Sequence, residues 1–157
     1  MSENLKFGTG GGPGNRSVFG YPDRWVWAKD NVGVLPAYKS GQDFFHVLWQ
    51  VNARGQVDLR VESPTRENHR SLNDIKCEII EALLASKLGD KGYHCRIGGA
   101  ISQGRNAKST KVFRVMLPDD QLKSTSTENI QAVHDALGST VDKSLLPFRE
   151  RLEKCFR

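Results

Sequence analysis

The stretch DFFHVLWQVNARGQVDLRVES, residues 43–63, decides the fold that we expect for this chain. Apolar residues recur at every second position along both halves, and the short turn NARG (52–55) separates the halves. A period of two on either side of a glycine-containing turn is typical of a β-hairpin. We expect the odd-numbered side chains to face the core, and the even-numbered face, from His46 to Glu62, to be the more solvated one.

Signals for a helix and for a second hairpin follow. Ser71 begins a capping-box pattern, and apolar residues then recur at helical spacing over 72–84. Beyond this helix, residues 93–102 and 109–118 are expected to be strands, with residues 109–118 carrying apolar side chains on one face. The polar and basic turn 103–108 would join them as a hairpin.

The end of the chain is expected to be helical. TSTE (125–128) is another capping-box pattern and opens a helix that Gly138 is expected to end. A further helix would begin near Ser139, and Pro147 would sit in the first turn of a last helix, PFRERLEKCF (147–156).

The segment YPDRWVWAKD (21–30) is expected to contain a short strand, with Trp25 and Trp27 buried on one face. The expected order is therefore β-ββ-α-ββ-α-α. Hairpins alternating with helices favour a two-layer α+β fold, with a mainly antiparallel sheet of two hairpins and the helices packed on one face.

We expect residues 1–20 to form a flexible arm and residues 21–157 to form a single α+β domain. The arm contains GTGGGPGNRS (8–17), whose five glycines raise the question of a phosphate-binding loop. The stretch lacks the Gly-Lys-Ser/Thr ending of a Walker loop, and neither a buried strand precedes it nor an amphipathic helix follows it. We therefore interpret it as a mobile connection.

Composition and charge narrow the classes of protein. The net charge is +5 and the pI is near 9.2, so the chain is attracted to polyanions such as nucleic acid or acidic protein surfaces. No run approaches the roughly 20 apolar residues of a membrane span, and no signal-peptide pattern appears. The odd count of cysteines, Cys77, Cys95 and Cys155, indicates reduced thiols and a cytoplasmic location.

Basic residues in two loops are the candidate binding site. Arg66, His69 and Arg70 lie just before the helix at 72–84, where free backbone amides add to the attraction for phosphate. Others surround the tip of the second hairpin, which could follow a nucleic-acid backbone. The alternative interpretation is that these loops are simply solvated. The predicted nucleic-acid-binding residues are Arg66, Arg70, Arg96, Arg105, Lys108 and Lys111.

Two further groupings suggest chemistry, and each has a plainer interpretation. Asp43, Asp58 and Arg60 have a spacing permissible for the acids and the cation of a metal-dependent nuclease, but arginine is a poor proton acceptor. The plainer interpretation is a turn residue and a cross-strand ion pair. His94 and Cys95 are adjacent and should point to opposite faces of a strand, so we expect no metal site and no cofactor there. Cys155 is expected in the core.

A family resemblance covers roughly two-thirds of the chain, from residue 44 to residue 156. This part resembles the uncharacterised small α+β domain found C-terminal to PD-(D/E)xK-type nuclease regions in bacterial restriction-like proteins. The resemblance implies a nucleic-acid-processing or defence context, and it implies no catalytic residue. The resembling segments are VDLRVES (57–63), LNDIKCEIIEALL (72–84), KVFRVML (111–117) and PFRERLEKCF (147–156).

Together these observations predict a non-enzymatic module that binds nucleic acid or an acidic partner surface through basic loops, in a bacterial defence or mobile-element context. Two alternatives stay open, a protein-interaction factor of the inhibitor or immunity type and a divergent metal-dependent nuclease. The oligomeric state stays open too, because an unpaired hairpin edge can pair with another subunit.

Overall fold

The alternating stretch at the centre of the chain forms the expected hairpin in the computed structural model, which describes residues 2–10, 17–28, 44–51, 56–63, 70–86, 88, 93–98 and 112–156. Of residues 94–98, only the backbone is described. The strands are β1 (Lys6–Gly10), β2 (Ser17–Tyr21), β3 (Val26–Ala28), β4 (Phe44–Val51), β5 (Val57–Glu62), β6 (His94–Gly98) and β7 (Val112–Met116). The helices are α1 (Arg70–Ala85), α2 (Ser126–Leu145) and α3 (Arg149–Cys155), with short 3-10 helices η1 (Asp23–Trp25), η4 (Asp119–Gln121) and η5 (Leu146–Phe148).

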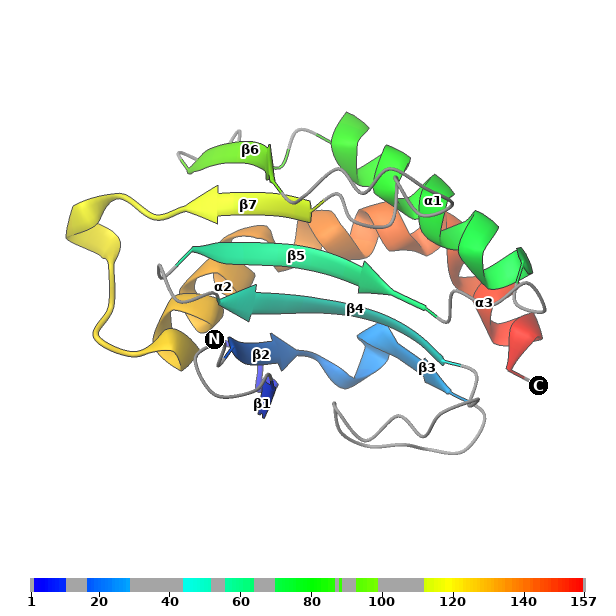
Figure 1. Ribbon diagram of the computed structural model, residues 1–157, viewed down its shortest axis with the longest axis horizontal. Coiled ribbons are helices and arrows are strands. Elements are labelled where there is room, and N and C mark those ends of the chain that lie inside the picture. The colour runs from blue at the N-terminus through cyan, green and yellow to red at the C-terminus, as the bar shows by residue number, and fades with distance from the viewer. Residues whose placement is uncertain are drawn as a thin grey trace.

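All seven strands belong to one sheet, and six of them follow the order β1-β2-β4-β5-β7-β6. The seventh, β3, lies on the same side of β4 as β2. It pairs with the beginning of β4, whereas β2 pairs with its end. Every pairing is antiparallel. Both expected hairpins, β4–β5 and β6–β7, are present, and β7 joins them by pairing with β5. The expected α+β fold is confirmed (Figure 1).

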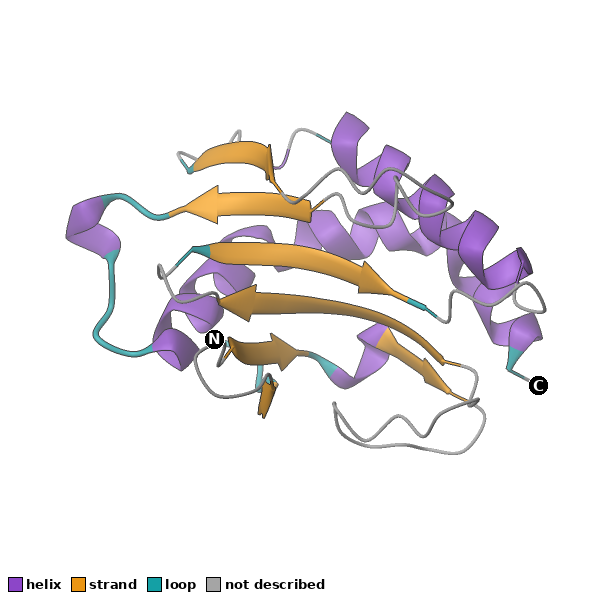
Figure 2. Ribbon diagram, viewed as in Figure 1, coloured by secondary structure: helices purple, strands orange, loops and turns teal. Residues whose placement is uncertain are grey.

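The helices form the second layer, and α2 passes behind the strands in Figure 2. α2 packs against β2, β4 and β5, while α1 packs against α2, α3 and β5. The odd-numbered side chains of the central hairpin are buried beneath this layer, as expected, and Trp49 at their centre has no exposed surface. Burial of such side chains is the main term that stabilises the fold, at about 2 kcal/mol or more for each large apolar residue.

The even-numbered face of the central hairpin is the more solvated of its two faces, as expected, because Phe44, Gln50, Arg60 and Glu62 are partly exposed, whereas three others are buried. His46 and Leu48 are fully buried, and Asp58 is only 6% exposed. The edge of the Tyr21 ring packs on the His46 ring at a centroid distance of 4.3 Å, and burial lowers the pKa of His46 to about 3. His46 and Asp58 are buried because neighbouring strands bring side chains onto this face, as β2 does with Tyr21 and β7 does with Arg114.

The segment expected to be a flexible arm instead supplies two strands. β1 and β2 pair over five residues each, and β2 continues the pairing into β4. Backbone hydrogen bonds hold these strands, so they need no apolar periodicity. Gly20 permits the close packing, because a Cβ there would lie 2.6 Å from the Ile130 side chain. Residues 11–16 of the glycine-rich stretch lie outside the described residues.

The tryptophans of segment 21–30 do not share a strand. Trp25 ends η1 and is fully buried, whereas Trp27 lies in β3 and is partly exposed. The two differ because the 3-10 turn rotates Trp25 toward α2, where its indole N–H finds a partner in Asp142.

Gly138 does not end a helix, contrary to the expectation. α2 runs through it without a break from the expected N-cap Thr125, whose hydroxyl oxygen accepts a hydrogen bond from the Glu128 amide at 3.3 Å. A glycine costs a helix only about 1 kcal/mol, and here the absence of a side chain leaves room for the His134 ring. A Cβ at Gly138 would lie 2.7 to 3.0 Å from the ring atoms of His134.

Three smaller points concern the ends of elements and the thiols. Pro147 lies in η5, immediately before α3, close to the expected place. Cys155 is exposed, so the expectation that it lies in the core was wrong, because it falls on the solvent side of α3. No helix in the described part of the chain is long and apolar enough to cross a membrane.

Candidate functional site

The structure describes the backbone position of two of the six predicted nucleic-acid-binding residues. Arg70 is the first residue of α1 and Arg96 is the third of β6, and for both only the backbone position is described. The other four, Arg66, Arg105, Lys108 and Lys111, lie outside the described residues.

The backbone places Arg96, the one described member of the second group of predicted residues, at one edge of the sheet. We call residues 94–116, from the start of β6 to the end of β7, the basic hairpin. β6 is the last strand of the sheet on that side, at the top of Figure 1. The register sets the Cα of Arg96 opposite that of Arg114, so two arginine positions are direct neighbours across β6 and β7.

Charge is distributed unevenly between this hairpin and the rest of the chain. The basic hairpin contains five lysines and arginines and no aspartate or glutamate. The other 18 lysines and arginines are matched by 18 aspartates and glutamates, so the hairpin carries the whole net charge of +5. This local excess is what a polyanion would meet.

One cation of the basic hairpin is neutralised within the sheet. Arg114 donates from Nε to Oδ1 of Asp58 at 2.8 Å and from a terminal nitrogen to Oδ2 at 3.1 Å. The two residues are direct cross-strand partners, and this forked pair raises the pKa of Arg114. Asp58 therefore forms the cross-strand ion pair of the plainer interpretation, although it is buried.

Arg60 also has partners within the sheet. It donates to the side-chain oxygen of Gln50 at 2.8 Å and lies 3.3 Å from a carboxylate oxygen of Glu62. Asp43, the third residue of the nuclease hypothesis, lies outside the described residues. Within the described ranges, no group of three or more His, Cys, Asp or Glu side chains could hold a metal ion.

Lys76 on α1 is a buried cation that sequence reasoning missed. It is 4% exposed, and burial lowers its pKa, while the nearby carboxylate of Glu62 acts in the opposite direction. The helical apolar pattern concealed it, because Lys76 occupies a position on the buried face of α1 between Ile75 and Ile79.

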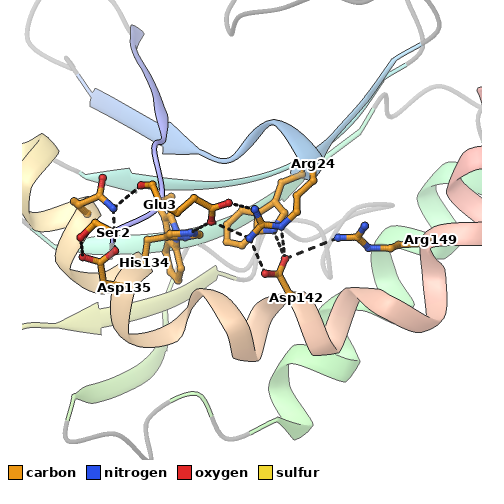
Figure 3. Close-up of polar contacts among 10 residues, drawn as sticks. Ser2, Glu3, Arg24, His134, Asp135, Asp142 and Arg149 are labelled. Atoms are coloured by element: carbon orange, nitrogen blue, oxygen red, sulfur yellow. Dashed lines mark hydrogen bonds and ion pairs between the residues drawn. The ribbon is translucent and has the colours of Figure 1, made fainter.

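The best-defined polar cluster lies near the opposite edge of the sheet, and no pattern in the sequence indicated it. We call Glu3, Arg24, His134 and Asp142 the N-terminal clasp (Figure 3). Arg24 donates from Nε to Oδ1 of Asp142 at 2.9 Å and from a terminal nitrogen to Oδ2 at 2.6 Å. The same guanidinium binds both carboxylate oxygens of Glu3, one of them at 3.0 Å.

His134 also binds the Glu3 carboxylate, at Oε1, which Arg24 contacts as well. Its Nε2 lies 2.7 Å from Oε1 of Glu3, and its Nδ1 accepts a hydrogen bond of 3.0 Å from the indole N–H of Trp49. An indole nitrogen can only donate, so Nδ1 carries no proton and Nε2–H donates to Glu3. Both ring nitrogens are occupied, which leaves His134 no lone pair to act as a general base.

The electrostatics of the clasp follow from these contacts. Hydrogen bonding to Arg24, followed by that to His134, lowers the pKa of Glu3 to about 2 against the effect of burial. Hydrogen bonds to the carboxylates of Asp142 and Glu3 raise the pKa of Arg24, and Asp142 contributes more than Glu3. Glu3 is therefore ionised at any pH near neutrality.

Neighbouring groups fix the terminal segment on α2. The side-chain amide of Gln131 donates to the backbone carbonyl of Glu3 at 3.0 Å and to Asp135 at 3.0 Å, and the Ser2 hydroxyl donates to Asp135 at 2.7 Å. Trp25 donates to Asp142 at 2.8 Å. The cluster can bind a carboxylate, but its donors and acceptors are mutually satisfied and it offers no activated nucleophile.

No family model, no curated protein and no solved structure matches this chain.

Proposed function

We propose that this protein is a non-enzymatic module that binds nucleic acid through the basic hairpin and the loop before α1. The observation that carries the proposal is the charge of residues 94–116, which have five cations and no acid and whose first strand, β6, is the edge strand of the sheet. The contact residues in this proposal are Arg66, Arg70, Arg96, Arg105, Lys108 and Lys111.

The hairpin supplies no acid of its own to neutralise its cations, so a partner outside the chain would be a suitable counterion. Arg114 is already paired with Asp58 and is not among the proposed contacts. Phosphates offer charge at a regular spacing, and a two-stranded ribbon with cations along it can follow a nucleic-acid backbone. Arg70 would add a contact at the start of α1, where the backbone amides also favour an anion.

Contacts of this kind imply weak sequence specificity and strong salt dependence. Each neutralised phosphate releases counterions, so four to six contacts correspond to a slope of about −3 to −5 in a plot of log K against log salt concentration. The family resemblance of residues 44–156 adds the hypothesis of a bacterial defence context.

The test is a fluorescence anisotropy titration of labelled single-stranded and double-stranded DNA and RNA at 50 mM and 200 mM salt. The variant R105A/K108A/K111A removes three hairpin cations, and we expect at least a tenfold loss of affinity at low salt. The matched control is K123A/K143A/K154A, which removes three exposed lysines outside the hairpin and should keep most of the affinity.

Two results would contradict the proposal. One is absence of binding to all four nucleic acids at low salt, and the other is an equal loss of affinity in the hairpin and control variants. Stable co-purification with a single acidic protein, lost in the hairpin variant and without nucleic acid, would instead favour a protein-interaction factor.

A further inference from the structure

The carboxylate of Glu3 lies in a site that other parts of the chain build. Arg24 in η1 binds both of its oxygens, His134 in α2 binds Oε1, and Gln131 in α2 binds the backbone carbonyl of Glu3. We call Arg24, Gln131 and His134 the carboxylate cradle. Gln131 and His134 lie 128 and 131 residues from Glu3 in sequence, and Arg24 lies 21 residues from it. Figure 3 shows Arg24 and His134 beside Glu3.

The cradle is held in shape by contacts that do not involve Glu3. Asp142 fixes the Arg24 guanidinium with two hydrogen bonds, at 2.9 and 2.6 Å, and is itself bound by the Trp25 indole. Trp49 fixes the tautomer and the orientation of the His134 ring, which is only 4% exposed. A site whose donors are oriented in advance loses little freedom when its ligand binds.

The occupant, by contrast, belongs to no helix or strand, and side chains of η1 and α2 hold it. Glu3 lies three residues before the first strand, in a segment without regular secondary structure, and its side chain is 40% exposed. The cradle therefore opens to solvent on the side from which Glu3 enters. If the Glu3 side chain left, the Nε2–H of the buried His134 would lose its acceptor, which carries a penalty that another carboxylate would relieve.

We propose that Arg24, Gln131 and His134 form a binding site for a carboxylate ligand, which Glu3 fills within the chain and which an external carboxylate can fill in its place. The ligand chemistry is a free small carboxylate or a glutamyl residue, whose carbonyl would also meet Gln131. This site lies at the opposite edge of the sheet from the basic hairpin, and it does not depend on nucleic-acid binding.

The test is chemical rescue of the full-length variant Glu3→Ala, which removes the carboxylate and leaves space for a small acid. The thermal unfolding midpoint is measured against sodium acetate and against N-acetylglutamate amide, with sodium chloride at matched ionic strength. At ten times the dissociation constant, we expect the midpoint of the variant to rise by roughly 3 to 5 °C.

Wild-type protein and Glu3→Gln are the controls, because in both the space is filled, and neither should respond beyond the chloride series. A larger response to N-acetylglutamate amide than to acetate would assign the site to a glutamyl ligand, and equal responses would assign it to small carboxylates in general. The proposal is overturned if neither compound raises the midpoint of Glu3→Ala saturably, or if wild type responds as strongly.

Discussion

The two edges of the sheet differ in whether the charged side chains grouped near them include both signs of charge. At the β1–β2 edge, every charged group of the N-terminal clasp meets an opposite charge or a donor from the same chain, so Arg24 binds two carboxylates and Glu3 binds Arg24 and His134. The basic hairpin, whose strand β6 forms the opposite edge, has five cations and no acid of its own. Folding explains the first set of charges, and the proposed function assigns the second set to a partner.

The edges also differ in the sequence distance that their contacts span. The clasp joins Glu3 to His134 and Arg24 to Asp142, more than 100 residues apart. The hairpin pairs neighbouring strands. Charge in the clasp should therefore contribute to stability, and charge in the hairpin should contribute mainly to binding.

Asp142→Ala should give the largest loss of stability. It removes the acceptor of the forked Arg24 contact and leaves the indole N–H of the fully buried Trp25 without a partner. We expect the free energy of unfolding to fall by about 3 kcal/mol in urea titrations. Asp135→Ala, which removes an exposed carboxylate on the same helix, should cost less than about 1 kcal/mol. Equal losses in the two variants would show that the contacts of Asp142 stabilise the fold no more than those of an exposed carboxylate.

Gly138→Ala should destabilise the protein although alanine is the better helix former. The new Cβ would meet the His134 ring at 2.7 to 3.0 Å, and this ring holds Glu3 and Trp49. Overpacking of this kind costs about 1–3 kcal/mol and the gain in helix propensity returns about 1, so we expect a net loss near 1 kcal/mol. Ser139→Ala, at an exposed position of α2, should be neutral or slightly stabilising, and urea unfolding distinguishes the two.

The stability of the clasp should depend on acid pH through Glu3. Its pKa is about 2 in the folded protein and 4.5 without the folded environment, so its contribution is fully present above pH 4.5. That contribution is lost as the pH falls toward 2. Since Glu3 is partly exposed, we expect about 1 kcal/mol of pH-dependent stability. Unfolding measured from pH 5.5 to pH 2.5 should show a steeper fall for wild type than for Glu3→Gln, and parallel curves would contradict the assignment.

The smallest effect on stability is expected from R105A/K108A/K111A. Removing like charges from a segment without acids should change the free energy of unfolding by less than about 0.5 kcal/mol. Urea unfolding of this variant beside wild type measures the change. A loss above about 1 kcal/mol would mean that these cations have partners within the fold, and it would remove the contrast between the two edges.

Several elements could be predicted because their signals are local. The hairpin β4–β5 follows from a period of two around a turn, and Thr125 is the N-cap of α2 because its hydroxyl lies three residues before Glu128. β1 and β2 were missed because backbone pairing leaves no apolar pattern in a glycine-rich segment. Gly138 was misjudged because its glycine serves packing against His134 rather than the end of a helix.

The sequence by itself determined the α+β class, the two hairpins, α1, the start of α2 and the concentration of positive charge in residues 94–116, since each depends on neighbours in the chain. Only the tertiary structure decided that Glu3, Arg24, His134 and Asp142 meet, and that Asp58 pairs with Arg114. The physical reason is that a buried charge or donor is stabilised by whichever group the packed layers bring within hydrogen-bond distance, and that group has no fixed spacing in sequence.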